Sequence, residues 1–434
     1  MRSRTAKINE CIADLLNNLA RIDVRHTVDM MEFYRAFSLD VVASTAFGIR
    51  IDSLREPNNP IVSNAKKFFG QKPITRILFE FYLTFSRLKK IRPSDFESFN
   101  YFARLTERLT REKRYLARRK SSNGLMSGKK IDFIQMFLNL IDNKDEGFQE
   151  SIEEEEQDDS HNLIDPSLSD LVTVYGHYES RGQEWESSTQ RRRSISLDEI
   201  KAQGILFFMA GYAGTASLLA NMSFLLAKHP KQQELLIQEI DAFPTQEFNF
   251  DIVQSCKYLD AVVWETLRLY PPVARVEREC TSDYKLSKSN ITVPAGMTVS
   301  IPIYAIHRDP LNFEDADTFV PERFLSNGDG EGSALRHPWC FLPFGGGPRN
   351  CLGIRLAILE AKLCIAQVLR RYRFHVDPGR VIEHFSDQVL VSPKNTPLRL
   401  EKRKATGRGA FQLKKSTSHS IRSDTKRLKR QATF

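Results

Sequence analysis

The stretch FLPFGGGPRNCLG, residues 341–353, surrounds one cysteine with a nearly bare backbone. It places four glycines and two prolines around Arg349 and Cys351. Glycine lets a backbone pass close to another body and adopt dihedral angles that other residues avoid. A helical apolar pattern starts directly after the cysteine. The sequence therefore predicts a thiol at a helix N-terminus, where backbone N–H groups and the helix dipole favour the thiolate.

This loop does not fit two common glycine-rich sites. A phosphate cradle needs a closing Lys-Ser/Thr pair, which is missing, and a dinucleotide fingerprint needs a glycine where Asn350 stands. A thiolate in a glycine-lined pocket beside Phe344 and Arg349 suits axial ligation of haem iron, with the arginine at a propionate. The remaining alternative is a tight glycine turn that holds a buried cysteine.

The same loop resembles the cysteine loop of the cytochrome P450 superfamily. The matching positions are Phe344, Gly345, Gly347, Arg349, Cys351 and Gly353. Glu265 and Arg268 in WETLR resemble the Glu-x-x-Arg pair of that family, and Arg323 in PERF resembles the third member of its ion network. YPPVARVER and YAIHRDP are most similar to the animal branch of family 3 drug-metabolising enzymes and thromboxane synthase.

The resemblance implies a mainly α-helical fold with small β-sheets and a bound haem b, with Cys351 as axial ligand. It implies haem contacts from Phe344, Arg349 and Gly353 and a propionate contact from Arg275. The residues that it places around the substrate pocket are Phe207, Phe208, Ala210, Gly211, Pro272, Val273 and Ala274. His307 is expected to form structural hydrogen bonds or a propionate contact, and not to bind iron.

The stretch AGYAGTAS departs from the family pattern, which is usually Ala/Gly-Gly-x-Glu/Asp-Thr. In the family, that acid and threonine deliver protons to iron-bound oxygen, but here Ala213 and Gly214 stand in their places. Thr215 stands one residue after the position where the family has its threonine, which turns it by about 100° around the helix. Ser217 lies one turn after Gly214. Thr215 and Ser217 are the candidate catalytic hydroxyls. Family members that rearrange peroxides also tend to lack the threonine.

We expect a monooxygenase that inserts one atom of O2 into a small apolar substrate such as a lipid, steroid or xenobiotic. The chain has no nicotinamide or flavin motif, so the expected electron donor is NADPH-cytochrome P450 reductase, with cytochrome b5 as a second candidate partner. The basic residues expected to steer an acidic reductase to the cysteine side are Arg355, Lys362, Arg370 and Arg371. Two alternatives stay open, a peroxide isomerase or dehydratase and a truncated non-catalytic binding protein. The resemblance implies the cytosolic face of the endoplasmic reticulum membrane.

Several predicted elements position these residues. Residues 1–142 show helical periodicity, and helices are predicted within 258–272, ended by two prolines, and within 352–374. The uncharged run 204–227 fits either a transmembrane helix or a core helix. Residues 291–306 predict two strands around a Pro-Ala-Gly turn.

Composition and charge give the domain organisation. A chain of 434 residues with 41% hydrophobic and 27% charged residues is globular. The net charge of +9 lies in the tail, since 11 of the 63 basic residues but one of the 54 acidic residues fall in 402–434. We therefore expect a neutral catalytic domain over 1–401, with a polar insert at about 143–196, a basic disordered tail at 402–434, and no nucleic-acid partner. Six cysteines without CxxC spacing favour a reduced compartment.

Three further expectations concern the chain's periphery. Ser194 behind Arg191–Arg193 resembles a basophilic kinase site, with an unmodified loop as the alternative. The segment 74–90 is predicted to be a core helix or a membrane-dipping surface segment. The family usually has an anchor, a first sheet and several helices ahead of the region that this sequence resembles. Without them, the 291–306 strands are expected to lack sheet partners and the haem to lack one wall.

Overall fold

The structure is a computed structural model that describes residues 1–23, 26–69, 96–121, 132–141, 195–244, 247–287, 289–325, 338–387 and 390–403. The chain divides into Met1–Arg403 and Lys404–Phe434, and the described residues all belong to the first part. Ser194, the segment 74–90, nearly all of the predicted polar insert and residues 404–434 lie outside the described residues. The described part is mostly helical with small antiparallel sheets, as predicted.

The N-terminal part consists of helices, as its periodicity predicted. They are α1 (Arg2–Leu19), α2 (Met30–Val42) with a π-helical continuation η1 (Ala43–Phe47), α3 (Pro60–Phe69), α5 (Phe96–Ser121) and α6 (Phe133–Ile141). Helix α2 begins after Asp29, whose carboxylate accepts a hydrogen bond from Met31 N at 3.0 Å. Such an N-cap satisfies one of the backbone donors that a helix start leaves unpaired.

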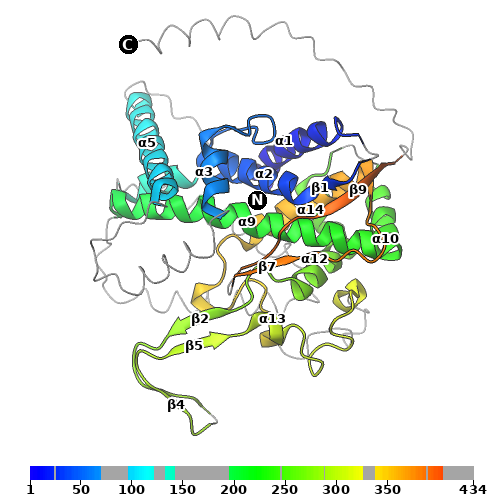
Figure 1. Ribbon diagram of the computed structural model, residues 1–434. Coiled ribbons are helices and arrows are strands. Elements are labelled where there is room, and N and C mark those ends of the chain that lie inside the picture. The colour runs from blue at the N-terminus through cyan, green and yellow to red at the C-terminus, as the bar shows by residue number, and fades with distance from the viewer. Residues whose placement is uncertain are drawn as a thin grey trace, which may run out of the picture. The chain divides into compact units, whose positions relative to one another are not determined.

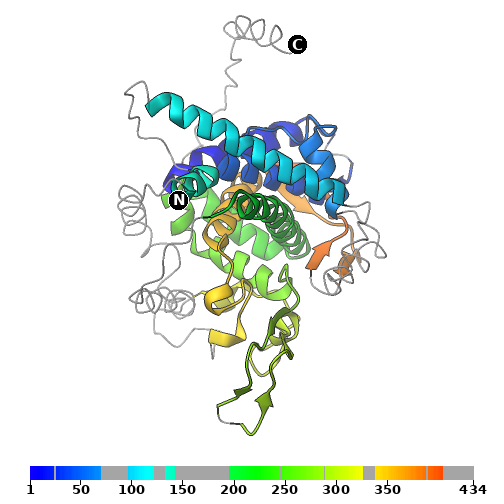
Figure 2. The ribbon, with the colours of Figure 1, turned by 90° about the vertical axis from the view of Figure 1, so that its left-hand side faces the viewer.

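Helix α9 (Leu197–Lys228) runs through the middle of the helical body (Figure 1). It starts with a capping box, in which Ser196 and Glu199 bond each other's backbone N–H groups. The helix contacts α2, α5, α12 and α14, and Figure 2 looks nearly along it, with other helices on several sides. By length and composition it could cross a membrane. Its position among these helices accounts for its apolar sequence as that of a core helix.

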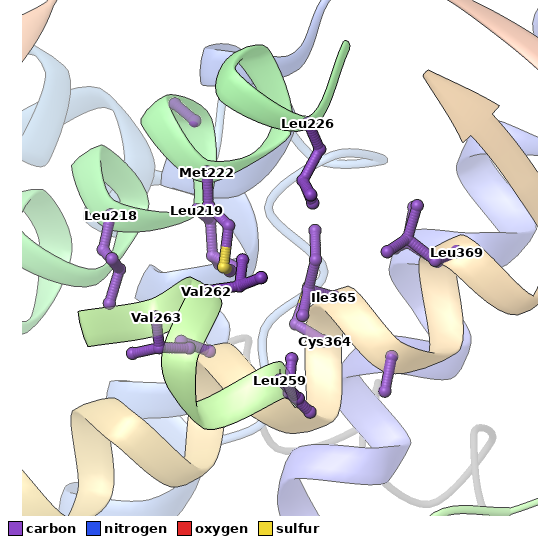
Figure 3. Close-up of a cluster of buried hydrophobic side chains, with 14 of the residues drawn as sticks. Leu218, Leu219, Met222, Leu226, Leu259, Val262, Val263, Cys364, Ile365 and Leu369 are labelled. Carbon is purple, nitrogen blue, oxygen red and sulfur yellow. The ribbon is translucent and has the colours of Figure 1, made fainter. Parts of the chain in front are cut away.

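The main core forms where α9 meets the helices of the C-terminal half. These are α10 (Pro230–Asp241), α11 (Phe250–Ser255), α12 (Lys257–Leu269) and α14 (Ile354–Arg371). Figure 3 shows Leu219 and Met222 of α9 pointing toward Val262 of α12, with Ile365 of α14 beside them. Helix α12 ends before the two prolines, and α14 begins three residues after Cys351. Both helices lie where the sequence predicted them.

Two sheets lie beside this core. Strands β1 (Val28–Asp29), β9 (Pro397–Lys402) and β6 (Tyr372–His375) form an antiparallel sheet in that order, which joins the start of α2 to the C-terminal strands. Strands β7 (His384–Asp387) and β8 (Leu390–Pro393) form a hairpin. The hairpin contacts α9 through β8, so it reaches the helix that carries the candidate catalytic hydroxyls.

Residues 291–306 form two strands around the Pro-Ala-Gly turn, as predicted, but the strands pair with upstream strands and not with each other, so the expectation that they lack sheet partners is wrong. Strand β5 (Thr298–Ile301) pairs with β2 (Val276–Glu279), and β4 (Thr292–Val293) pairs with β3 (Tyr284–Lys285). The turn between β4 and β5 instead bonds to the upstream chain, since Gly296 N donates to Cys280 O at 2.7 Å. Gly296 has φ +80°, which favours glycine. Both pairs extend away from the helices (Figures 1 and 2).

Short helices connect these strands to α14. They are α13 (Ile303–Ile306) and the single-turn helices η3 (Pro321–Phe324), η4 (Pro338–Cys340) and η5 (Gly347–Arg349).

A buried carboxyl lies between α14 and α2. Glu360 is 2% exposed, and its Oε1 has no hydrogen-bond partner among the residues that the structure describes. Burial raises the pKa of this carboxyl well above its ordinary value, and only Ser38 opposes that shift. The folded protein therefore keeps a proton on Glu360 that the unfolded chain loses near pH 4.5. The contribution of Glu360 to the free energy of unfolding therefore falls as the pH rises above about 4.5.

Replacing Glu360→Gln should stabilise the protein at pH 8, because the amide keeps the shape of the carboxyl and cannot ionise. We expect a gain of about 1–3 kcal/mol at pH 8 and a smaller gain at pH 5, measured by urea unfolding. Glu112→Gln on the exposed face of α5 is the control and should leave the pH dependence unchanged. A Glu360→Gln variant that is no more stable than the wild type at pH 8 would contradict this account.

Candidate functional site

Backbone hydrogen bonds hold the loop before α14 in one conformation. Gly345 N donates to Leu342 O, and Cys351 N donates to Phe344 O, each at 3.0 Å. Gly345 and Gly347 both have φ +76°, in the left-handed region where a Cβ is strained. These two positions therefore require glycine for the turn itself, whatever lies against the loop.

The thiol of Cys351 lies at the N-terminal end of α14. The residue is exposed, yet desolvation by the surrounding loop raises the pKa of its thiol above the ordinary value, while the N–H of Gly353 opposes the shift. This direction is opposite to the one that a helix N-terminus alone predicts, because the desolvation outweighs the single hydrogen bond. The thiol is thus neutral at pH 7, and a bound metal cation would have to displace its proton.

Aromatic residues support the loop from below. The Phe344 ring packs edge-on against Trp264 of α12 at 6.4 Å, and Phe341 does so at 6.0 Å. A Cβ added to Gly346 would lie 2.9 Å from the Trp339 ring, so glycine is needed there for close approach. Trp264 was not among the predicted site residues, although a large aromatic residue directly before Glu265 is a usable signal.

Helix α12 carries a buried ion network. Glu265 and Arg268 are both fully buried, and the guanidinium donates to the carboxylate with two hydrogen bonds of 2.8 and 2.9 Å. Arg323 of η3 adds a third bond to Glu265 at 3.1 Å. The structure thus brings the three residues of the expected network together. Buried ion pairs need such multiple bonds, because desolvation of each charge is costly.

The same network fastens the segment 307–320 to α12. Arg268 donates to the carbonyl oxygens of His307 and Ala316, at 2.8 and 2.6 Å. Val320 N donates to Glu265 at 2.9 Å. His307 is fully buried, and its ring nitrogens lie 3.2 Å from Arg268 O and 2.8 Å from Leu342 N. It therefore has the structural bonds that were one of its two expected roles.

The candidate catalytic hydroxyls of α9 are buried. Ser217 Oγ donates to Ser392 Oγ of β8 at 2.8 Å, so its proton is engaged by the hairpin. Thr215 is 7% exposed. Ala213 and Gly214 are half-buried. A Cβ added to Gly214 would meet no described atom within 4 Å, so open space adjoins α9 at this position.

The expected pocket residues of α9 have different surroundings. Phe208 is fully buried and stacks on Phe47 at 3.9 Å, and Phe207 packs on Phe133 at 3.8 Å. A Cβ at Gly211 would overlap Val42 of α2, so this glycine allows close packing of the two helices. Ala210 is exposed. Core packing accounts for Phe208 and Gly211 without a ligand.

The segment between α12 and β2 is pinned on both sides. Ala274 O accepts from Tyr304 N, and Pro272 O accepts from Val391 N, each at 2.9 Å. Val273 and Ala274 are half-buried. Arg275 Nε is buried and lies 2.9 Å from Glu277 Oε1. It has hydrogen-bond geometry to no described atom, Glu277 included. It is a buried donor that an additional acceptor would satisfy.

The structure corrects the expected basic surface on α14. Lys362 is fully buried, and its ammonium lies 2.7 Å from Asp260 and 2.9 Å from Gln254. The reason is that this face of α14 packs against α11 and α12. Arg370 donates to the carbonyl oxygens of Ile240 and Phe243.

Three other basic residues reach the surface, namely Arg349 in the loop, Arg355 in the first turn of α14 and Arg371 at its C-terminal end. Arg349 and Arg371 are exposed, and Arg355 is half-buried.

Comparison with known proteins agrees with this arrangement. The family model described as "Cytochrome P450" matches residues 2–163 and 177–400. The chain belongs to the cytochrome P450 family. It is 33% identical over 354 residues to Cytochrome P450 3A29 of Sus scrofa and 31% identical over 398 residues to Cytochrome P450 3A14 of Cavia porcellus. These alignments cover 80% and 88% of this chain, but 59% and 66% of those relatives.

Membership of the family implies haem held by a cysteine thiolate, and the residues present fit that group. Cys351 is an exposed residue three positions before the start of α14. The buried Arg275 Nε has hydrogen-bond geometry to no described acceptor. The open space beside Gly214 lies on the helix that the family places over its cofactor. Phe344, Arg349 and Gly353 belong to the same loop as the sulfur.

Two of the three glycines of α9, Gly211 and Gly214, should respond oppositely to alanine. Gly211→Ala should destabilise the protein, because its Cβ would overlap Val42, whereas Gly214→Ala should be neutral or stabilise it by up to about 1 kcal/mol through helix propensity. Thermal or urea unfolding of the two variants measures both effects, each variant being the control for the other. Equal effects of the two substitutions would show that Val42 does not constrain the spacing of α2 and α9.

Proposed function

We propose that this chain carries the catalytic core of a haem-thiolate monooxygenase of the endoplasmic reticulum membrane. The observation that carries the proposal is the exposed residue Cys351 in a glycine turn whose Phe344 ring packs on Trp264, next to the buried ion network of α12. Haem, when bound, supplies the activation of O2 for insertion of one oxygen atom into a substrate. Electrons would come from NADPH-cytochrome P450 reductase, with cytochrome b5 as a further partner.

The chain's own residues divide the remaining work. Cys351 would hold the iron, and Phe344 and Gly353 would lie against the ring. Arg349 and Arg275 are the candidate propionate contacts, since both carry guanidinium groups near the loop or the pinned segment that follows α12. Arg355 and Arg371 are the basic groups of α14 left to attract an acidic reductase.

Proton delivery is the unusual part of this site. Ala213 and Gly214 cannot hold a proton, and the Ser217 hydroxyl already donates to Ser392. Ser217 could give its proton to a bound species only after breaking that bond. Thr215 and water in the open space beside Gly214 are therefore the groups left for the task. General acid catalysis contributes typically 10²–10⁴-fold, so this arrangement limits proton delivery strongly.

We propose a small apolar substrate such as a lipid, steroid or xenobiotic. The side chains of Ala210, Val273 and Ala274 are apolar and at least partly accessible. Apolar walls of this kind retain a ligand mainly through burial of its apolar surface. Half-buried Phe207 belongs to the same set by its position on α9, one turn before Ala210.

Cys351→Ser should abolish the thiolate-type spectrum of the reduced carbon monoxide complex, because serine offers no thiolate to the iron. Cys340→Ser is the matched control within the same segment and should leave the spectrum unchanged. The spectrum is recorded on the haem-loaded chain and on both variants. Loss of the spectrum in Cys340→Ser alone would overturn the assignment. A wild-type chain that takes up no haem would favour the alternative of a truncated non-catalytic binding protein.

A second candidate function is rearrangement of a peroxide, as an isomerase or dehydratase. Two observations favour it: no proton-donating side chain stands at 213 or 214, and Ser217 is engaged by the hairpin. A peroxide substrate brings its own O–O bond and does not require the same proton delivery. We rank this function second, because the matched motifs are those of oxygenating relatives.

The double replacement Ala213→Glu and Gly214→Thr separates the two functions. If oxygenation is native, the restored acid and hydroxyl should increase the product formed per reducing equivalent, and the open space at 214 admits the threonine. The measurement compares product with NADPH consumed in a reductase-supported assay. If peroxide rearrangement is native, the wild type turns over a lipid hydroperoxide without reductase and the double replacement brings no gain.

A further inference from the structure

We propose that His307 is a positioning residue that holds the Cys351 loop on the buried ion network of α12. His307 follows α13 directly and lies 44 positions before the cysteine in the sequence. Its imidazole joins the two elements by one hydrogen bond to each. The inference rests on the proposed haem site for its catalytic meaning, but its geometry does not depend on haem.

The first half of the link is a reciprocal bond with Arg268. The guanidinium donates to His307 O at 2.8 Å, and His307 Nδ1 lies 3.2 Å from Arg268 O. A carbonyl oxygen can only accept, so Nδ1 carries the proton of the ring. His307 is thus attached to α12 through both its backbone and its side chain.

The second half of the link reaches the loop. Leu342 N lies 2.8 Å from His307 Nε2, and a backbone N–H can only donate. Nε2 must therefore be the unprotonated nitrogen. The two bonds independently require the same neutral tautomer, with the proton on Nδ1. Imidazole is suited to this task, because its two nitrogens can donate on one side and accept on the other.

The bonded amide is the first of a series that leads to the sulfur. Leu342 O accepts from Gly345 N, and Phe344 O accepts from Cys351 N. Leu342 is 6% exposed, so its N–H would be a buried unpaired donor without the histidine. The Phe341 ring, 5.1 Å from the imidazole, packs beside the same link.

The surroundings of His307 keep it neutral. Burial is the largest cause that lowers the pKa of its imidazole to about 3, and the cations Arg268 and Arg308 act in the same direction. An acceptor at Nε2 is therefore present throughout the physiological pH range. The ring is fully buried and both of its nitrogens are engaged, so it is not available as an iron ligand.

Two amide variants separate the halves of the link. Gln in His307→Gln places its oxygen near the position of Nε2 and can accept from Leu342 N. Asn in His307→Asn is shorter, so it can donate to Arg268 O near the position of Nδ1 but does not reach Leu342 N. His229→Asn is the matched control, since His229 bonds Leu225 O in α9 and has no bond to the loop.

The first readouts use the full chain without haem. We expect His307→Asn to accelerate hydrogen exchange at the Leu342 amide about tenfold and to increase the alkylation rate at the Cys351 thiol, because a net hydrogen bond is lost. His307→Gln should stay within about threefold of the wild type for both rates, and His229→Asn should change neither. Equal rates in His307→Asn and His307→Gln, or an unchanged Leu342 rate in His307→Asn, would overturn the proposal.

The second readout is spectroscopic. In the haem-loaded chain, His307→Asn should convert part of the reduced carbon monoxide complex to the form without thiolate ligation, and His307→Gln should preserve the thiolate form. A preserved thiolate spectrum in His307→Asn would contradict positioning of the sulfur. If the wild type itself gives no thiolate spectrum, the proposed function fails, whereas the exchange and alkylation rates still decide the role of His307.

Discussion

The buried pair of Glu265 and Arg268 is the interaction on which the site depends. Two full charges lie at 0% exposure, where desolvation penalises each strongly. They are retained because every strong hydrogen-bonding direction of the pair is used, by Arg323 and by backbone groups of the segment 307–320. The pair therefore fixes a long irregular segment that has little regular secondary structure of its own. Removal of one partner would leave an uncompensated buried charge, which typically costs about 3–5 kcal/mol.

The ligand loop depends on that segment for its own position. Its glycine turns set the local backbone, while Trp264 of α12 packs against Phe344 and His307 bonds the backbone N–H of Leu342. The backbone that carries Cys351 is held by these contacts and by the bond from Cys351 N to Phe344 O. The helix dipole does not lower the pKa of the Cys351 thiol, so the free thiol is neutral. A bound metal cation would stabilise the thiolate instead, and the exposed residue at a defined position is suited to bind one.

Helix α9 combines a packing role with an open face. Gly211 brings it close to α2, while Gly214, three residues later, adjoins open space. Two of its polar residues are engaged by the β7–β8 hairpin, with Ser217 bonded to Ser392 and Asn221 bonded to His384. The helix is therefore held on several sides, and the open position lies where the family usually has its threonine. This is the physical basis for two candidate chemistries at one site.

The sequence by itself determined the local features of this protein. Four features depend on neighbours in the chain, so spacing and residue type were sufficient to predict them. They are the glycine turn before Cys351, the start of α14, the end of α12 at two prolines, and the pairing of Glu265 with Arg268 three residues later. The family resemblance rested on the same short stretches. Only the tertiary structure decided the features that depend on distant residues.

One such feature is the pairing of β5 with β2, where a hairpin between β4 and β5 would have been the more local pairing. Another is the burial of Lys362, which follows from the helices packed on α14. The raised pKa of the Cys351 thiol belongs to the same group, because desolvation is the sum of contributions from many residues that the sequence does not show as neighbours. The link from Arg268 through His307 to Leu342 joins three segments separated by more than thirty residues each. No spacing rule connects such positions, since only the folded chain brings them within hydrogen-bond distance.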